Sequence, residues 1–132
     1  MSHLKRMSSL YQSDAWPDPS DPPFINAALE IETPLGPQAL LAALHAIEAG
    51  FGRRRSARNA PRTLDLDLVA YHGETLDGAQ GGPVLPHPRL KGRAFVLAPL
   101  AEIAPDWRHP LNGQTAQEML AATDRAGIRK IS

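Results

Sequence analysis

The sequence predicts one α+β domain, in which helices pack on a mainly antiparallel sheet to form a sandwich. Residues 24–33 and 63–71 alternate apolar and other side chains with the period of half-buried strands. Between them, residues 37–48 repeat apolar side chains at helical spacing. This irregular succession of strands and helices favours an α+β sandwich over a doubly wound sheet. The chain has 132 residues, a length typical of one compact domain, so we expect residues 1–132 to form a single domain.

Each further element has its own local signal. Residues 14–23 contain four prolines and are expected to form a loop. Pro37 suits the first turn of a helix, which we expect to end at about Glu48 because Gly50 and Gly52 follow. Downstream, the expected elements are a glycine-rich turn with a short edge strand at 75–84, a helix at 93–103 with Pro99 near its start or at a kink, a short amphipathic helix at 115–123 and a last strand at 128–131.

Composition and charge exclude several classes of protein. There is no cysteine, which excludes disulfide frameworks, thiolate catalysis and zinc-thiolate sites. No apolar stretch approaches the ~18 residues that a membrane helix needs, and the first residues lack the apolar segment of a signal peptide. We therefore expect a cytoplasmic protein without a membrane partner. The 14 basic residues balance the 14 acidic ones, so the molecule as a whole has no excess positive charge that would attract polyanions.

The sharpest chemical signal lies in residues 63–71, TLDLDLVAY. In a strand, Asp65 and Asp67 share one face, and they stand about 6.5–7 Å apart because each residue rises about 3.3 Å. Two like charges on one face destabilise a strand unless a cation bridges them. Mg²⁺ binds through one or two carboxylates and completes its shell with substrate phosphates and water. The pair therefore predicts a metal site, and the alternative is an ordinary strand whose acidic face is solvated.

A cluster of arginines directly precedes the two aspartates. No acidic residue lies between Glu48 and Asp65. Planar, permanently charged guanidinium groups beside a Mg²⁺-binding pair are typical of sites that bind polyphosphates and transfer phosphoryl groups. The alternatives are a solvated basic loop and a module that binds nucleic acid. The arginines of the cluster are Arg53, Arg54, Arg55, Arg58 and Arg62.

Residues 58–69, RNAPRTLDLDLV, resemble the signature of the 6-hydroxymethyl-7,8-dihydropterin pyrophosphokinase family of folate biosynthesis, and they meet every constrained position of it. The segments 8–13 (SSLYQS) and 24–33 (FINAALEIET) resemble the second and third strands of the family. The segments 47–56 (IEAGFGRRRS) and 85–106 (LPHPRLKGRAFVLAPLAEIAPD) resemble two later parts. The resemblance implies a ferredoxin-like α/β sandwich and the transfer of pyrophosphate from ATP to the pterin, with AMP as the second product.

The resemblance also implies roles for individual residues. It assigns catalysis to Arg53, Arg62, Asp65 and Asp67, and it gives the two aspartates the task of holding two Mg²⁺ ions. ATP, the co-substrate, would be bound by Glu48, Arg53, Arg55, Arg62, His87 and Arg93. The pterin would be bound by Ser13, Trp16, Phe24, Asn26 and Phe95, with the phenylalanines on the two faces of the ring and the Asn26 amide at its edge. The implied partners are these small molecules and no nucleic acid, and the full-length protein would be a monomer.

Simpler interpretations of the same residues stay open at this point. Phe24 and Phe95 fit core aromatics, and His87 between two prolines fits a turn. Asn26 and Glu48 fit exposed positions on a strand and a helix. The chain as a whole could be a non-catalytic homologue that retains partial ligand binding.

The sequence departs from the family pattern at three places. Asn59 stands where the family usually has tryptophan, and Pro88 where it has a tyrosine after the histidine. The family opens with a strand that ends in Gly-Ser-Asn and a long helix, whereas this chain starts just before the segment that resembles the second strand. We therefore expect the domain to be incomplete at its N-terminus, as in a shortened gene model.

Overall fold

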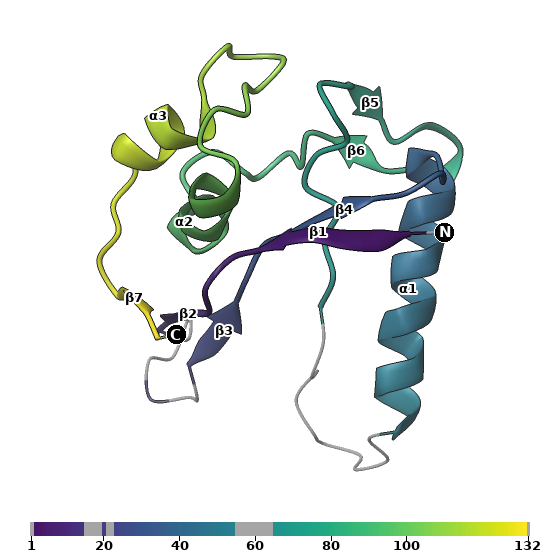
Figure 1. Cartoon of the computed structure of the whole chain (residues 1–132), viewed down its shortest axis with the longest axis horizontal. Helices are drawn as coiled ribbons and strands as arrows, with labels where there is room; N and C mark the ends of the chain where they lie inside the picture. The colour runs from purple at the N-terminus through teal and green to yellow at the C-terminus, as the bar shows by residue number, and fades with distance from the viewer. Residues whose placement is uncertain (1, 15–19, 21–22, 55–64, 132) are drawn as a thin grey trace. The chain divides into compact units, whose positions relative to one another are not determined.

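The computed structural model describes residues 2–14, 20, 23–54 and 65–131 (Figure 1). It shows antiparallel strands together with helices, which confirms the predicted α+β class. Contacts divide the chain into two compact units, one formed by Met1–Thr33 with Pro88–Ser132 and one by Pro34–His87. In the described part of the chain, every helix is too short or too polar to cross a membrane.

The first unit is built on a long, interrupted hairpin. One arm contains β1 (His3–Met7) and β2 (Tyr11–Ser13), and the other contains β3 (Phe24–Asn26) and β4 (Leu29–Glu32). β1 pairs with β4 and β2 with β3, both antiparallel, and β7 (Ile128–Lys130) pairs with the other edge of β2 (Figure 1). β7 was predicted and β1 was not, while the strand expected at 24–33 is divided into β3 and β4.

A serine hydroxyl bridges the interruption of the hairpin. The backbone N–H of Ser8 donates to the carbonyl of Ala28 at 2.9 Å, and the N–H of Ala28 donates to Ser8 Oγ at 2.8 Å. The hydroxyl thus replaces a backbone carbonyl, and the buried Ser8 keeps its polar group paired. The two arms therefore stay aligned across the break.

The alternating pattern of residues 24–31 predicts two faces for this arm of the hairpin, and the structure buries the more polar one. Asn26, Ala28 and Glu30 are half-buried, whereas Ile25 and Leu29 are 51% and 54% exposed. The reason is that helix α2 (Ala94–Ile103) packs on β2, β3 and β4 from the Asn26 side. The apolar face of residues 25–31 has no covering element within the described residues of this unit.

Helices α2 and α3 (Ala116–Ala121) form the core of the first unit. Both helices were predicted. Pro99 lies inside α2 and is buried there, and Thr115 caps α3 by accepting a hydrogen bond from the N–H of Glu118. The buried apolar side chains of the two helices are Ala94, Leu97, Ala98, Ala101, Ile103, Ala116, Met119 and Leu120.

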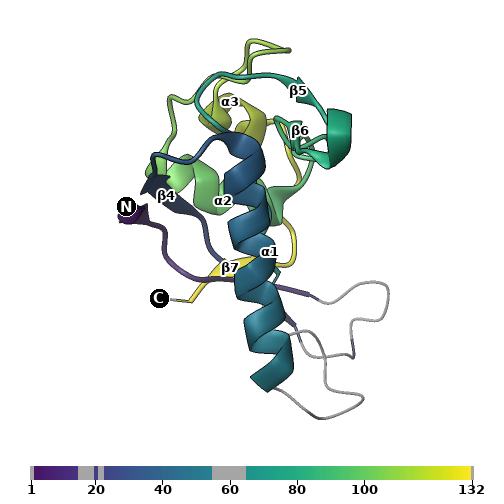
Figure 2. The same ribbon diagram turned by 90° about the vertical axis from the view of Figure 1, so that its right-hand side faces the viewer.

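The second unit contains one long helix and a small hairpin. Helix α1 runs from Pro37 to Arg54, as one unbroken helix in the view of Figure 2. The predicted end at about Glu48 is therefore wrong. A glycine ends a helix when it adopts the left-handed conformation, and Gly50 does not have a positive φ. It stays helical at a cost of about 1 kcal/mol relative to alanine.

The small hairpin confirms the expected turn region at 75–84. It consists of β5 (Leu76–Asp77), the 3₁₀ turn η1 (Ala79–Gly81) and β6 (Val84–Leu85). Gly78, at the start of the turn, has a φ of 83°, a value that glycine adopts without strain. Leu40, Pro83, Leu85 and Pro86 are buried in this unit.

The strand expected at 63–71 is not formed over residues 65–71, so that prediction is wrong for the residues that the structure describes. A strand needs a neighbouring strand to pair its backbone groups, and no described strand of this unit pairs with the segment. The predicted alternation is nevertheless present. Asp65 and Asp67 are exposed, while Leu66 and Leu68 are half-buried.

Candidate functional site

In the second unit, hydrogen bonds join three of the predicted site segments. The Glu48 carboxylate on α1 accepts a hydrogen bond from the backbone N–H of Leu66 at 2.6 Å. The backbone N–H of His87 donates to the carbonyl of Val69 at 2.8 Å. The segment that carries Asp65 and Asp67 is therefore held by the helix on one side and by the chain around His87 on the other.

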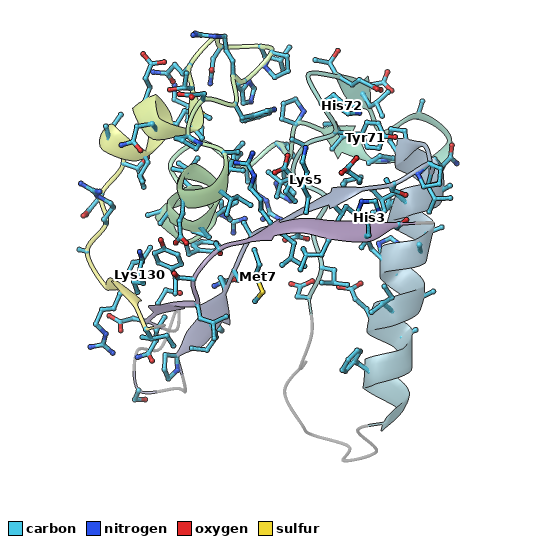
Figure 3. All side chains as sticks on the ribbon, in the orientation of Figure 1. His3, Lys5, Met7, Tyr71, His72 and Lys130 are labelled. Carbon is cyan, nitrogen blue, oxygen red and sulfur yellow. The ribbon has the colours of Figure 1, made fainter. Side chains whose placement is uncertain are left out.

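Tyr71 holds the far end of the same segment. Its hydroxyl donates to the carbonyl of Leu35 at 2.6 Å, next to the start of α1 (Figure 3). Its ring also meets the His72 ring edge to face, with centroids 5.0 Å apart. This contact was not predictable from the sequence, because a hydroxyl that bonds to a backbone carbonyl 36 positions away follows no local pattern.

The two aspartates have the chemistry of a Mg²⁺ site that is completed by a substrate. They are exposed on the same side of the segment, so phosphate oxygens and water can reach a bound ion. The described residues contain no group of three or more histidine, cysteine, aspartate or glutamate side chains that could enclose a metal. Carboxylate oxygens are ligands that Mg²⁺ accepts, and this ion usually keeps several other oxygen ligands.

The first unit holds four of the predicted pterin ligands. Ser13 on β2 lies opposite Phe24 on β3, and Asn26 lies opposite Tyr11. Residues two apart on a strand share a face, so Phe24 and Asn26 lie on one face of the sheet, and α2 with Phe95 packs on β2 and β3. Phe24 is 51% exposed, so its interpretation as a core aromatic is wrong.

Arg93 and Phe95 form a local pair at the start of α2. Arg93 is the residue that immediately precedes the helix, and its guanidinium carbon lies 4.7 Å from the centroid of the Phe95 ring. A guanidinium over an aromatic face is a favourable cation–π contact. The structure thus brings together one residue predicted to bind ATP and one predicted to bind the pterin.

The remaining predicted residues lie outside what the structure describes. Trp16, Arg55 and Arg62 are outside the described residues, and Arg53 is described only as part of the helix backbone. Besides Tyr71, Glu102 was not predicted, although it contacts Ser9, Tyr11 and Lys130 in the first unit. A single glutamate near the end of the mainly apolar helix α2 carries no sequence signal for such a role.

Comparison with known proteins identifies the family. Residues 1–105 match the family described as 7,8-dihydro-6-hydroxymethylpterin-pyrophosphokinase. The chain is 44% identical over 125 residues to the 2-amino-4-hydroxy-6-hydroxymethyldihydropteridine pyrophosphokinase of Synechocystis sp. This alignment covers 95% of the chain and 63% of the relative. The chain is also 43% identical to the enzyme of the same name from Methylorubrum extorquens, over 94% of the chain and 76% of the relative. It is 42% identical to that from Pseudomonas aeruginosa, over 98% of the chain and 78% of the relative.

The chain therefore spans somewhat less than two thirds of the Synechocystis relative and about three quarters of the other two. The match extends over the segments that carry Glu48, Asp65 and His87 in the second unit and Phe95 in the first. It confirms the resemblance that the sequence indicated. This chain belongs to the 7,8-dihydro-6-hydroxymethylpterin-pyrophosphokinase family.

Proposed function

We propose that this chain transfers the pyrophosphoryl group of ATP to 6-hydroxymethyl-7,8-dihydropterin, with AMP as the second product. The observation that carries the proposal is the exposed pair Asp65 and Asp67 within a chain of this family. Its segment is held by two hydrogen bonds, one from the Leu66 N–H to the Glu48 carboxylate and one from the His87 N–H to the Val69 carbonyl. An aspartate pair that served only as a solvated surface would not require its backbone to be fixed by a carboxylate.

On the nucleotide side, Asp65 and Asp67 would hold two Mg²⁺ ions, which neutralise phosphate charge and orient the triphosphate when bound. Arg53, Arg55 and Arg62 would contact the phosphates from the chain that precedes the aspartates, and His87 and Arg93 would add further contacts. Guanidinium groups suit this task because they stay charged and present two parallel donors to an oxyanion.

On the pterin side, Phe24 and Phe95 would stack on the two faces of the ring. The exposure of Phe24 supports this role, since a half-exposed aromatic on a strand gains contact area when a planar ligand covers it. Asn26 would pair with the ring edge, where its amide offers both donors and an acceptor. Ser13 and Trp16 would complete the set of pterin ligands.

In the reaction, the hydroxymethyl oxygen of the pterin attacks the β-phosphorus of ATP. A bond forms between that oxygen and the β-phosphorus, and the hydroxyl proton is released. The bond between the β-phosphorus and the oxygen bridging to the α-phosphorus breaks, and AMP leaves with that oxygen. The protein contributes mainly by positioning the two substrates and by placing positive charge around the transferred group.

We further propose that the protein works in the cytoplasm as a monomer, without nucleic acid. The balanced net charge of zero supports the last point, because binding to nucleic acid usually needs an excess of basic residues.

The product nucleotide tests the proposal. Purified protein is incubated with ATP, Mg²⁺ and the reduced pterin, and the nucleotides are separated by chromatography. We expect AMP to appear in step with the pterin diphosphate and only when the pterin is present. Production of ADP, or release of AMP without the pterin, would contradict the proposed reaction.

A further inference from the structure

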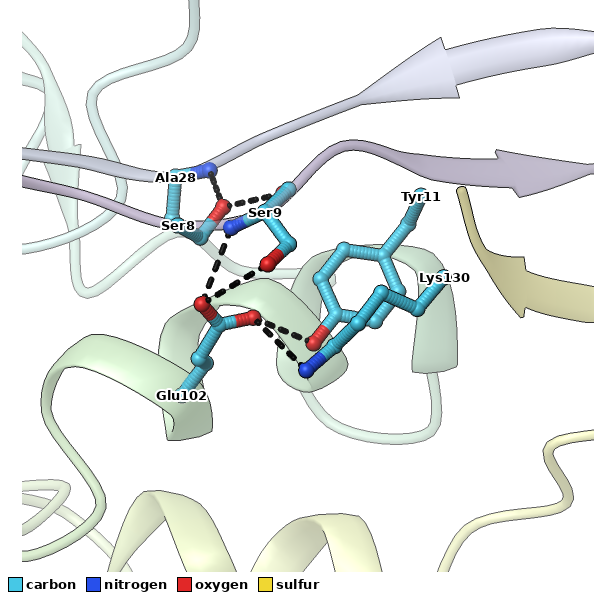
Figure 4. Close-up of polar contacts among 6 residues, drawn as sticks. All are labelled: Ser8, Ser9, Tyr11, Ala28, Glu102 and Lys130. Atoms are coloured by element: carbon cyan, nitrogen blue, oxygen red, sulfur yellow. Dashed lines mark hydrogen bonds and ion pairs between the residues drawn. The ribbon is translucent and has the colours of Figure 1, made fainter. Parts of the chain in front are cut away.

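Glu102, near the end of α2, contacts polar groups of two other segments, residues 9–11 and β7 (Figure 4). Its Oε2 accepts hydrogen bonds from the backbone N–H of Ser9 at 2.9 Å and from Ser9 Oγ at 3.2 Å. Its Oε1 accepts one from the Tyr11 hydroxyl at 2.6 Å and lies 3.8 Å from Nζ of Lys130 on β7. One carboxylate thus connects the helix to the start of β2 and to β7.

The electrostatics agree with these contacts. The hydrogen bond from the Tyr11 hydroxyl, followed by that from the Ser9 backbone, holds the pKa of Glu102 below its ordinary value. Burial and the same carboxylate raise the pKa of Tyr11 to about 12. At neutral pH the pair is therefore an ionised carboxylate and a protonated phenol, which form a charge-assisted hydrogen bond.

Glu102 also connects the elements that carry the residues assigned to the pterin. On α2 it follows Phe95 by seven positions, which is about two helical turns, so both side chains point from the same side of the helix. In the sheet, Tyr11 on β2 is directly opposite Asn26 on β3, and Phe24 lies two positions before Asn26 on β3. The contact between Glu102 and Tyr11 is thus a direct side-chain link between the helix that carries Phe95 and β2, which pairs with the strand β3 that carries Phe24 and Asn26.

We propose that Glu102 is a positioning residue for the pterin: by holding Ser9 and Tyr11 it fixes the distance between Phe95 on α2 and the ring-binding face of β3. This inference rests on the proposed function. Stacking on both faces of a planar ring requires the two aromatic walls to stand at one definite separation. A link that fixes this separation before binding reduces the conformational entropy that is lost when the ligand binds between the two aromatic side chains.

The test uses steady-state kinetics and pterin binding on the whole chain. We expect Glu102→Ala to raise the KM for the pterin about tenfold while changing the KM for ATP less than about twofold. Tyr11→Phe removes only the hydroxyl and keeps the ring, so it should fold normally and raise the pterin KM by about threefold. Equilibrium binding of the pterin, measured by calorimetry with a non-hydrolysable ATP analogue, should weaken by the same factors.

Thr115→Ala is the matched control. It removes the cap of α3, which also packs on α2, and it should lower stability by about 1 kcal/mol without touching the link to β2. If this control shifts the pterin KM as much as Tyr11→Phe does, or if both Tyr11→Phe and Glu102→Ala leave pterin binding unchanged, Glu102 is not a positioning residue. A wild-type protein that binds no pterin at all would instead overturn the proposed function, and this inference with it.

Discussion

The carboxylate of Glu48 and the backbone N–H of Leu66 are 2.6 Å apart, although the two residues are 18 positions apart in the chain. Leu66 lies between Asp65 and Asp67, so this bond fixes the peptide unit that joins the two halves of the proposed metal site. A carboxylate that accepts from a backbone N–H forms a strong, charge-assisted bond. We therefore expect Glu48 to act on the aspartate pair through the backbone.

Replacing Glu48 should weaken the binding of nucleotide through the aspartates. We expect Glu48→Ala to weaken Mg²⁺-dependent ATP binding about tenfold, because the peptide between Asp65 and Asp67 loses its anchor. Glu48→Gln keeps an acceptor oxygen for the Leu66 N–H and should lose only about half as much binding free energy. Calorimetric titration with ATP and Mg²⁺ measures both. If the Gln variant is as weak as the Ala variant, the negative charge of Glu48 acts on the ligand itself.

The aspartate pair itself should control the dependence on Mg²⁺. In Asp65→Asn the segment keeps its shape and loses one anionic ligand, so we expect the Mg²⁺ concentration for half-maximal activity to rise at least about tenfold. Glu74→Gln removes an exposed carboxylate elsewhere in the same unit and serves as the control. It should leave the Mg²⁺ dependence unchanged. Equal behaviour of the two variants would mean that Asp65 belongs to a solvated acidic face.

The elements with strong local signals were predictable from the sequence. Thr115 and Glu118 stand at the spacing of a capping box, and the structure forms both of its hydrogen bonds. The alternation of exposed and half-buried side chains over residues 65–68 also follows the sequence pattern. The end of α1 was not predictable in this way, because Gly50 permits the left-handed conformation without requiring it.

The wrong predictions concern features that depend on what lies beside an element. The pattern of residues 65–71 is that of a strand, but strand formation needs a partner, which the described residues of this unit do not supply. In the same way, the alternation of residues 24–31 predicts two faces and cannot say which of them α2 covers. The links through Glu48, Tyr71 and Glu102 join residues far apart in sequence and leave no pattern in it.

The Tyr11 hydroxyl should stay protonated far into the alkaline range. Its pKa is raised to about 12, above the ordinary value of 10, by burial and by the Glu102 carboxylate. A group with a higher pKa in the folded state contributes stability that is present below pH 10 and is lost as the pH rises towards 12. An ultraviolet titration of phenolate should therefore show a late step that disappears in Tyr11→Phe. A Tyr11→Phe curve that keeps this step would show that another group causes it.

The cap of α3 should make stability depend on pH in the acidic range. The Glu118 carboxylate accepts a hydrogen bond from the backbone N–H of Thr115. This bond, and to a lesser extent the hydrogen bond with the Thr115 side chain, holds the pKa of Glu118 below the ordinary value of 4.5. Because the folded-state pKa is the lower one, this contribution is present above pH 4.5 and is lost as the pH falls through the folded-state value.

Thr115→Ala and Glu118→Gln separate the two halves of this cap. Thr115→Ala should lower the free energy of unfolding by about 1 kcal/mol at neutral pH, whereas Thr115→Ser keeps the hydroxyl and should lose little. In Glu118→Gln the amide can still accept from Thr115, but nothing titrates, so the acid-side loss of stability should become shallower. Urea unfolding at several pH values measures all three variants. An acid-side slope that is the same in Glu118→Gln and in the wild type would show that the capping box makes no contribution to stability that depends on charge.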